Sequence, residues 1–409
     1  MEVVITRCGG LDVHKATVVA TVRVPGESGR RRVVTETFGT MTPDLIALRE
    51  WLQAFGVTHV ALESTGVYWK PVYYVLEDAF ELLLVHMREL KHVPGKKTDV
   101  KDSDWLAQLL ECGLLRRSFV PPPPIRELRD ITRYRVQQTR ERSREVNRLQ
   151  KVLEDAGVKL TSVLTDIMGA SGRAMVEALV AGTTDPRVLA ELARGQLRKK
   201  LPALQRALVG RFRPVHAFLL EQILAKIDYL DEVLERLTTE IDRRVAPFEP
   251  MLTALDTIPG IDRIGAISLV AETGGDMTRF PSAAHLCSWG GMCPGHDESA
   301  GKRRSGKTRK ANRYLRSTLI QAGVAASHKK DSALRTLYAR VKGRRGHKKA
   351  VVATGHQILE IAYFVMRDGI TYRELGADYF QRCGREQTAR RHVRQLEALG
   401  YVVTVQPTA

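Results

Sequence analysis

The sequence contains few cysteines, and their spacing excludes the common cysteine-based architectures. Five cysteines are scattered over 409 residues, and none belongs to a CxxC pair. An odd, scattered set argues against a disulfide framework and fits a reducing compartment. Cys287 and Cys293 lie close to His296, but without a CxxC or HxxxH pair we do not predict a zinc site.

Long apolar runs are also missing. No stretch reaches the roughly eighteen apolar residues of a membrane helix, and the first residues lack a basic segment followed by an apolar one. We therefore expect a soluble protein of the cytoplasm. The length allows about two or three domains, and 44% hydrophobic with 27% charged residues is typical of a globular chain.

Acidic residues are outnumbered by basic ones. The chain has 64 Lys and Arg against 46 Asp and Glu, a formal net charge of +18. Such an excess favours a polyanionic partner, because basic side chains release counterions from phosphates on binding. A basic protein that binds no polyanion is the alternative that charge alone leaves open.

The amino-terminal part alternates strand and helix signals. β-branched stretches separated by turn residues predict strands at 3–15, 16–24 and 31–38. The elements predicted next are a helix containing Leu45, Leu48, Trp51 and Leu52, a strand at 58–65, a helix at 66–79, a strand at 80–86 and a helix at 98–113. This order, an antiparallel meander joined to parallel strands by crossover helices, is the ribonuclease-H order.

Four carboxylates fall where such a fold would hold divalent metal. Asp12 lies on the first predicted strand and Glu63 on the fourth, which are neighbours in this sheet. Asp99 and Asp102 project from one helix face, whereas Asp104 points off that face. Four negative charges this close would repel one another, and two Mg²⁺ (or Mn²⁺) ions would relieve the repulsion.

A plain structural role is the alternative for each carboxylate. Asp12 could begin a turn, Asp99 could cap its helix, and Glu63 could be an exposed strand-end residue. Agreement of all four with one fold favours the metal site. Carboxylates that hold metal in a strongly basic protein predict phosphodiester chemistry on nucleic acid.

The middle of the chain predicts long helices. Four prolines at 121–124 mark a linker, and an arginine-rich helix follows at 125–157. Its cationic face is predicted to contact phosphates, with a solvated helix face as the alternative. The face comprises Arg126, Arg129, Arg133, Arg140, Arg144, Arg148 and Lys151. A second helix carries a coiled-coil pattern that could pair within the chain or between chains, formed by Leu220, Ile223, Ile227, Leu230, Leu234, Leu237 and Ile241.

The carboxy-terminal part is basic and mainly helical. Residues 255–274 resemble a helix–hairpin–helix element whose Pro-Gly turn would expose amides to phosphate, or a plain turn between core helices. Residues 300–316 predict a loop that meets nucleic acid, or a mobile surface loop. Helices are predicted at 314–327, 333–343 and 349–369, and then a small helical appendage that ends in a short strand. The cations of the basic loop predicted to contact phosphates are Lys302, Arg303, Arg304, Lys307 and Arg309.

Several motifs occur in order along the chain: GLDVHK, LESTGVY, KKTDVKD, IPGI, and GMCPGHDES with the basic tract after it. Together they resemble the DEDD transposases of insertion sequence family 110, which are also called bridge recombinases. The resemblance covers nearly the whole chain, and the ordered set of motifs is highly specific.

The resemblance implies a domain plan and a nucleophile. It implies a RuvC-like domain at 1–120 with Asp12, Glu63, Asp99 and Asp102 as metal ligands, a helical coiled-coil region at 121–248, a mainly α transposase domain at 249–373 and an appendage at 374–409. The family's serine matches Ser299, although the chain departs from the motif after it, where it reads ESAG. From residues alone, Ser305 and Thr308 compete with this assignment.

The resemblance also implies partners. Members of the family use a noncoding RNA from their own element to pair with donor and target DNA, and they assemble as a dimer of dimers in which the carboxylates of one subunit complete the serine site of another. The expected function is therefore an RNA-guided DNA recombinase. A RuvC-like junction endonuclease that uses water and a non-catalytic nucleic-acid-binding protein are the alternatives.

Overall fold

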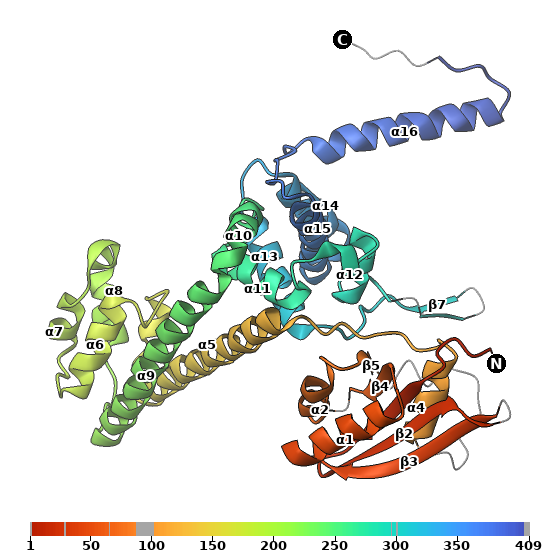
Figure 1. Cartoon of the computed structure of the whole chain (residues 1–409). Helices are drawn as coiled ribbons and strands as arrows, with labels where there is room; N and C mark the ends of the chain where they lie inside the picture. Colours follow the sequence, from red (N-terminus) through yellow and green to blue (C-terminus); the bar gives the residue numbers. More distant parts are fainter. Residues whose placement is uncertain are drawn as a thin grey trace. The chain divides into compact units, whose positions relative to one another are not determined.

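The computed structural model describes residues 2–27, 30–64, 66–86, 102–295, 297–299 and 302–404. Contacts divide the chain into two compact units, Met1–Pro121 and Pro122–Ala409, and each is described by itself (Figure 1). The predicted divisions near residues 248 and 373 stay predictions.

A five-stranded sheet in the order β3-β2-β1-β4-β5 forms the centre of the first unit. β1 to β3 make an antiparallel meander, and β4 and β5 continue the sheet parallel to β1. The strands are β1 (Cys8–Val13), β2 (Thr17–Pro25), β3 (Arg31–Gly39), β4 (His59–Glu63) and β5 (Glu81–Val85). The predicted mixed α/β arrangement is confirmed, and its RuvC-like kinship stays a prediction.

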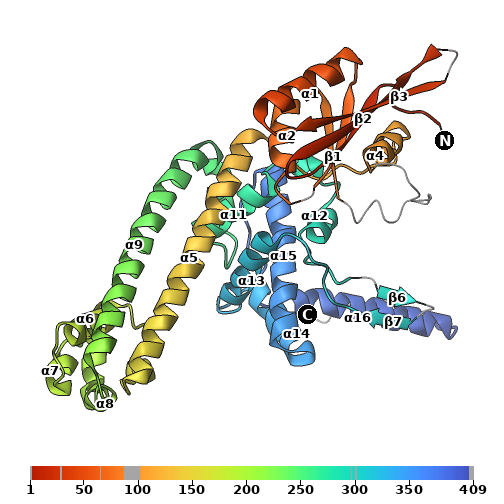
Figure 2. The ribbon, with the colours of Figure 1, turned by 90° about the horizontal axis from the view of Figure 1, so that it is seen from below.

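Helices lie on both faces of this sheet. Leu11 and Leu62 belong to the core shared with α1 (Thr42–Ala54) and α2 (Trp69–Leu76). On the opposite face, Cys8 and Ala61 pack with Leu110 of α4 (Asp102–Glu111). Figure 2 shows α1 and α4 on either side of the strands. Alternation along each strand therefore decides which side chains meet α4.

α4 rests directly on the backbone of β1 at Gly10. A Cβ at this position would lie 2.2 Å from the carbonyl oxygen of Ser103 and 2.5 Å from the amide nitrogen of Ala107. Both obstacles are backbone atoms of the helix, so a side chain at residue 10 would push α4 away from the sheet. Glycine is required here by close approach rather than by its backbone angle.

Polar contacts also join α4 to β2. The Arg23 guanidinium donates to Asp104 at 2.8 Å and to Glu111 at 3.0 Å, and both carboxylates belong to α4. The hydroxyl of Thr21, which is fully buried, hydrogen-bonds with that of Ser103 at 2.8 Å. Charge-assisted bonds of this kind fix the rotation of the helix about its own axis.

Over its described residues the second unit is almost entirely helical, apart from a short hairpin of β6 (Asp297–Ser299) and β7 (Lys302–Ser305) that projects beyond α12 (Figure 2). Its helices, among the described residues, are α5 (Pro123–Asp155), α6 (Ala170–Val180), α7 (Pro186–Glu191), α8 (Leu201–Ala207), α9 (Pro214–Val245), α10 (Glu249–Asp256), α11 (Arg263–Thr273), α12 (Ala283–Trp289), α13 (Arg313–Ala326), α14 (Ala333–Arg345), α15 (His347–Asp368) and α16 (Tyr379–Ala398). Short 3-10 turns lie at 160–162, 195–200, 246–248 and 277–279.

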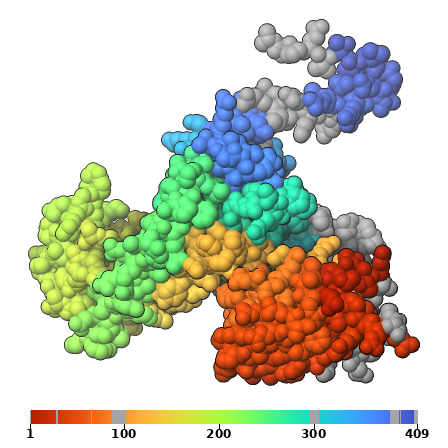
Figure 3. Space-filling model, in the orientation of Figure 1, coloured from red at the N-terminus to blue at the C-terminus, as the bar shows by residue number. Residues whose placement is uncertain are grey.

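The two long helices α5 and α9 pack side by side and antiparallel. The start of α5 and the end of α9 share one core, which contains Leu128 and Val245. The end of α5 and the start of α9 share another, which contains Leu149 and Leu220. The predicted apolar helix therefore pairs within the chain, while a coiled coil between chains stays a prediction. α6 to α8 gather on one side of α9 (Figure 3).

Three local expectations differ from the structure. Pro123 and Pro124, predicted as linker, begin α5, because the first helical turn needs no amide donors. Residues 302–305, predicted as loop, form β7 by pairing with β6. The predicted closing strand is wrong within the described residues 399–404, which follow α16 without a strand partner. None of the helices in the described ranges is long and apolar enough to cross a membrane.

We predict that Gly10→Ala destabilises the first unit by about 2–3 kcal/mol, because the new methyl meets backbone and α4 must move. Urea unfolding gives the stability, and hydrogen exchange should show faster opening of residues 102–111. Gly9→Ala is the matched control on the opposite face, where a Cβ would meet the end of the Leu52 side chain at 3.2 Å. Equal effects of the two substitutions would contradict the packing argument.

Candidate functional site

Asp12 and Glu63 occupy matching positions on neighbouring parallel strands. Leu11 of β1 pairs with Leu62 of β4, and each carboxylate follows directly after its strand's paired leucine. Because the leucines face α1 and α2, the next residue on each strand faces α4. The two carboxylates therefore share one edge and one face of the sheet. Both are only partly exposed.

Asp102 is the first residue of α4, the helix that covers this same face. Gly10, two residues before Asp12, is the point where α4 touches β1, so the packing brings the helix start to the sheet near the strand ends. Asp104 is committed to Arg23, which agrees with its predicted separation from the site. Asp99 lies outside the described residues.

The carboxylates of Asp12, Glu63 and Asp102 are of the right type for a hard divalent cation, but their arrangement is incomplete. Carboxylate oxygens are the ligands that Mg²⁺ and Mn²⁺ prefer. Within the described part of the chain, no three His, Cys, Asp or Glu side chains are close enough together to hold a metal ion. The Asp12 carboxylate instead lies 3.2 Å from Nε2 of the exposed His14. Completion of a metal site would therefore need Asp99 and a reorientation of Asp12.

Ser299 ends β6 and is paired with Lys302, the first residue of β7. This places it beside the turn of the hairpin. The rival hydroxyls have local partners: Oγ of Ser305 accepts from the Lys307 amide at 3.1 Å, and Oγ1 of Thr308 accepts from Arg316. These bonds give Ser305 and Thr308 roles in shaping the loop that follows β7.

The cations predicted to meet phosphate lie in different settings. Lys302, Arg303 and Arg304 form most of β7, while Lys307 and Arg309 are exposed in the loop after it. On α5, Arg144 pairs with Glu141 and Arg148 with the buried Glu145, whereas Arg140 lies 5.9 Å from the ring centre of Tyr314. Part of the positive charge on α5 is therefore balanced within the protein.

The IPGI turn has a packing role in the structure. Gly260 has φ of +91°, and a Cβ there would lie 2.2 Å from the carbonyl oxygen of Ala322 on α13. The Gly265 amide at the start of α11 already donates to the Asp262 carboxylate at 2.7 Å. These contacts favour the plain turn between core helices over a phosphate seat.

Of the cysteines near the hairpin, Cys287 is buried and Cys293 is partly buried. Burial raises the pKa of Cys287 to about 12 and also raises that of Cys293. Sγ of Cys293 lies 3.9 Å from Nδ1 of His356, while His296 lies outside the described residues. Zinc binds thiolates, and burial of this kind disfavours the thiolate form.

Two features were not predicted from the sequence. Glu272 of α11, only 2% exposed, accepts hydrogen bonds from Nε and Nη2 of Arg133 at 2.7 Å and one from Asn312. Arg129 donates to the carbonyls of Ala271 and Glu272 at 2.9 Å. In the sequence, the feature that could have indicated this network is the acidic Glu272 within the apolar run of α11. The network ties α5, α11 and α13 together.

The second is a basic cluster at the junction of α14 and α15. All of its cations are exposed, and its signal in the sequence was the run KGRRGHKK. The members are Lys342, Arg344, Arg345, Lys348 and Lys349. Surfaces of this composition attract phosphate backbones.

Two family models match the chain. One, described as a transposase of the DEDD IS110 type, matches residues 9–157. The other, described as the IS116/IS110/IS902 transposase family, matches residues 252–339. Together the two ranges span more than half of the chain.

Two curated proteins are similar over shorter stretches. An uncharacterized 43.6 kDa protein of insertion element IS110 from Streptomyces coelicolor is 35% identical over 130 residues, which are 31% of this chain and 30% of that protein. An uncharacterized 42 kDa protein of insertion element IS900 from Mycobacterium paratuberculosis is 33% identical over 120 residues, 28% of this chain and 29% of that protein. The chain thus aligns with less than a third of each relative's length.

We predict that Glu272→Ala destabilises the second unit by about 3 kcal/mol, because Arg133 would keep its charge in a half-buried place without its carboxylate partner. Urea unfolding measures the change. Glu249→Ala is the control, since Glu249 pairs with Arg263 at the surface, where ion pairs contribute little. A control effect as large as that of Glu272→Ala would show that burial of the network is unimportant.

Proposed function

Because the chain belongs to the IS110 family of transposases, we propose that it cleaves and rejoins DNA strands at the ends of an insertion element, with Ser299 as the nucleophile. The observation that carries the proposal is the shared edge and face of Asp12 and Glu63, with Asp102 on the helix that covers them. Carboxylates gathered at strand ends are a common support for phosphoryl transfer.

Asp12, Glu63, Asp99 and Asp102 would hold Mg²⁺ or Mn²⁺. Such an ion, when bound, would activate a coordinated hydroxyl and stabilise charge on the leaving oxygen. The first unit contributes the rigid part of this arrangement, since two ligands lie on paired strands and one begins a helix fixed at Gly10. Rigid support of this kind keeps ligands in place before the substrate arrives.

Ser299 would attack a backbone phosphate of DNA. A bond forms between Oγ and phosphorus, and one phosphorus–oxygen bond to a sugar breaks. The serine proton passes to a base or to solvent, and the released sugar oxygen takes up a proton. The phosphoserine link keeps the energy of the broken bond for rejoining, whereas attack by water would only cut. Lys307 and Arg309, exposed in the loop after β7, would offset phosphate charge.

We also propose that a noncoding RNA of the element guides the protein to donor and target DNA, and that the active form is a homodimer or a dimer of dimers. In that assembly the carboxylates of one subunit complete the serine site of another. The family resemblance, the net charge of +18 and the exposed Lys307 and Arg309 of the loop after β7 support this proposal.

Cleavage of element-end DNA in the presence of Mg²⁺ and the guide RNA should leave protein covalently attached to DNA, detected as a band that resists denaturing detergent. Ser299→Ala should abolish the band, and Ser305→Ala should keep it because that hydroxyl is a local acceptor. Cutting without any adduct would favour the water-using endonuclease. Binding without cutting under any metal would favour the non-catalytic alternative.

Asp12→Asn or Glu63→Gln should slow strand cleavage by at least about a hundredfold and leave DNA binding unchanged, because each removes a metal ligand but no phosphate contact. Asp78→Asn is the matched control, an exposed carboxylate just before β5, at the opposite edge of the sheet. Single-turnover cleavage and gel-shift binding measure the two effects. Near-normal cleavage by Asp12→Asn would rule out the carboxylate site.

A further inference from the structure

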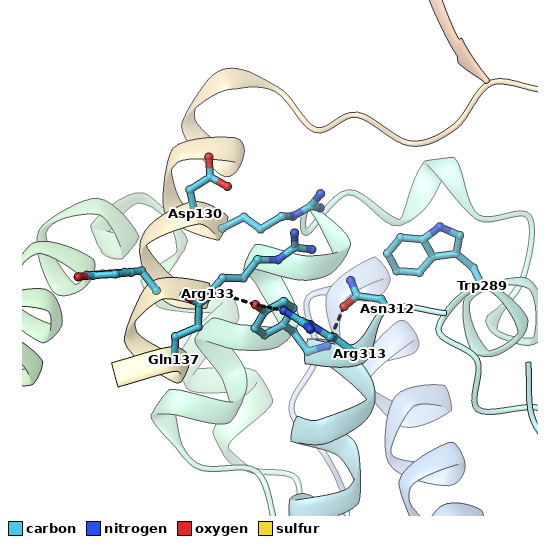
Figure 4. Close-up of a pocket in the computed structure, with 9 residues that line it drawn as sticks. Asp130, Arg133, Gln137, Trp289, Asn312 and Arg313 are labelled. Atoms are coloured by element: carbon cyan, nitrogen blue, oxygen red, sulfur yellow. Dashed lines mark hydrogen bonds between the residues drawn. The ribbon is translucent and has the colours of Figure 1, made fainter. Parts of the chain in front are cut away.

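A pocket lies between α5, the end of α12 and the start of α13, and no step of the proposed chemistry uses it. Its volume is about 610 Å³, within the range of sites that hold small ligands. Figure 4 shows Arg133 extending from α5 toward Asn312 and Arg313, with the Trp289 ring on the other side. All the residues that line it belong to the second unit.

On one side of the pocket, arginine guanidinium groups gather around the ring of Tyr314. The guanidinium carbons of Arg133 and Arg313 each lie 4.9 Å from the ring centre of Tyr314, and that of Arg140 lies 5.9 Å away. The Tyr314 oxygen accepts from Gln137 at 3.1 Å and from Arg313 at 2.9 Å. With two donors already aimed at this oxygen, its own proton is left to donate to a ligand.

The pKa of Tyr314 reflects the cations around its ring. Burial alone would raise the pKa of Tyr314, but hydrogen bonds from Gln137 and Arg313 and the nearby charges bring it below its ordinary value. An anion placed in the pocket would be stabilised by the same field.

The network around Glu272 holds this side in place. The buried carboxylate accepts from Nε and Nη2 of Arg133 and also from Asn312. The Oδ1 of Asn312 caps α13 by accepting from the amides of Tyr314 and Leu315. The cationic side is thus fixed before any ligand arrives, which reduces the entropy lost on binding. Arg313 is exposed and completes it from the solvent side.

Trp289 supplies a different chemistry. Its indole is half-buried at the end of α12 and packs at a tilt against Phe280, with ring centres 5.4 Å apart. A nucleotide carries a base and a phosphate. The indole offers a face on which any base can stack, and the guanidinium groups across the pocket can bind the phosphate. In a duplex the bases are stacked on one another, so only an unpaired nucleotide could enter.

We propose that this pocket binds one unpaired nucleotide of a nucleic-acid strand, with its phosphate at Arg133, Arg313 and the Tyr314 hydroxyl and its base toward Trp289. The inference rests on the proposed action on nucleic acid and deepens it, because it assigns a place where a strand is held open. It requires neither metal nor the serine.

The test is equilibrium binding of the full chain, in EDTA, to a fluorescent ten-nucleotide single strand that contains one 2-aminopurine. Fluorescence anisotropy gives the affinity, and quenching of 2-aminopurine reports stacking. Arg313→Ala should weaken binding about tenfold, and Trp289→Leu should weaken it similarly and remove the quenching. Trp289→Phe should retain most of both, because a ring remains.

Arg187→Ala is the matched control, since it removes an exposed arginine of α7 outside the pocket, and it should change affinity less than about twofold. Circular dichroism checks that each variant is folded. Equal losses from Arg187→Ala and Arg313→Ala, or an equal effect of Arg313→Ala on a duplex of the same length, would overturn the pocket. Adenosine monophosphate binding as tightly as the strand would overturn the assignment to a strand.

The readout separates this inference from the proposed function. Absence of DNA cleavage would reject the recombinase, and the single-strand binding experiment would still test the pocket by itself. Unchanged binding by Arg313→Ala and Trp289→Leu, together with normal cleavage, would reject only the nucleotide pocket.

Discussion

Direct contact between α4 and the backbone of β1 at Gly10 is the constraint on which the first unit depends. The sheet alone places Asp12 and Glu63 together, because parallel neighbours in register end at the same edge. Asp102 begins the helix on the same face, and α4 can lie within backbone distance of β1 because Gly10 has no side chain. Arg23 and Thr21 then fix the rotation of α4 through Asp104, Glu111 and Ser103.

In the second unit, a buried charge fixes how the packed helices are rotated against one another. Its apolar core fixes how deeply α5, α11 and α13 pack, but leucine and alanine contacts tolerate small rotations. The Glu272 carboxylate specifies one rotation, since Arg133 must present Nε and Nη2 to it and Asn312 must reach it while capping α13. Such networks add little net stability, and their main effect is to disfavour alternative packings.

Sequence patterns predicted the element order well where periodicity is strong. The meander, the parallel strands and the helices of the second unit follow from alternation and from apolar repeats. The register that aligns Asp12 with Glu63 could be anticipated only from the expected fold. The Glu272 network could not, because its members, Arg133, Glu272 and Asn312, are far apart in the sequence and each is ordinary alone. The β6–β7 hairpin was missed since its strands are short and polar, one acidic and the other basic.

Net charge is an incomplete guide to where this chain would meet nucleic acid. Arg23, Arg142 and Arg173 are all committed to carboxylates inside their own unit, so they add to the formal charge and hold the fold. Exposed cations gather instead after β7 and at the α14–α15 junction. Long-range attraction depends on the whole charge, but the path of a bound strand depends on these surface groups. Both clusters and the arginine-lined pocket lie in the second unit, whereas the strand-end carboxylates lie in the first. The proposed chemistry therefore requires substrate held by one unit to reach carboxylates of the other, and this requirement can be met within a chain or between copies of it.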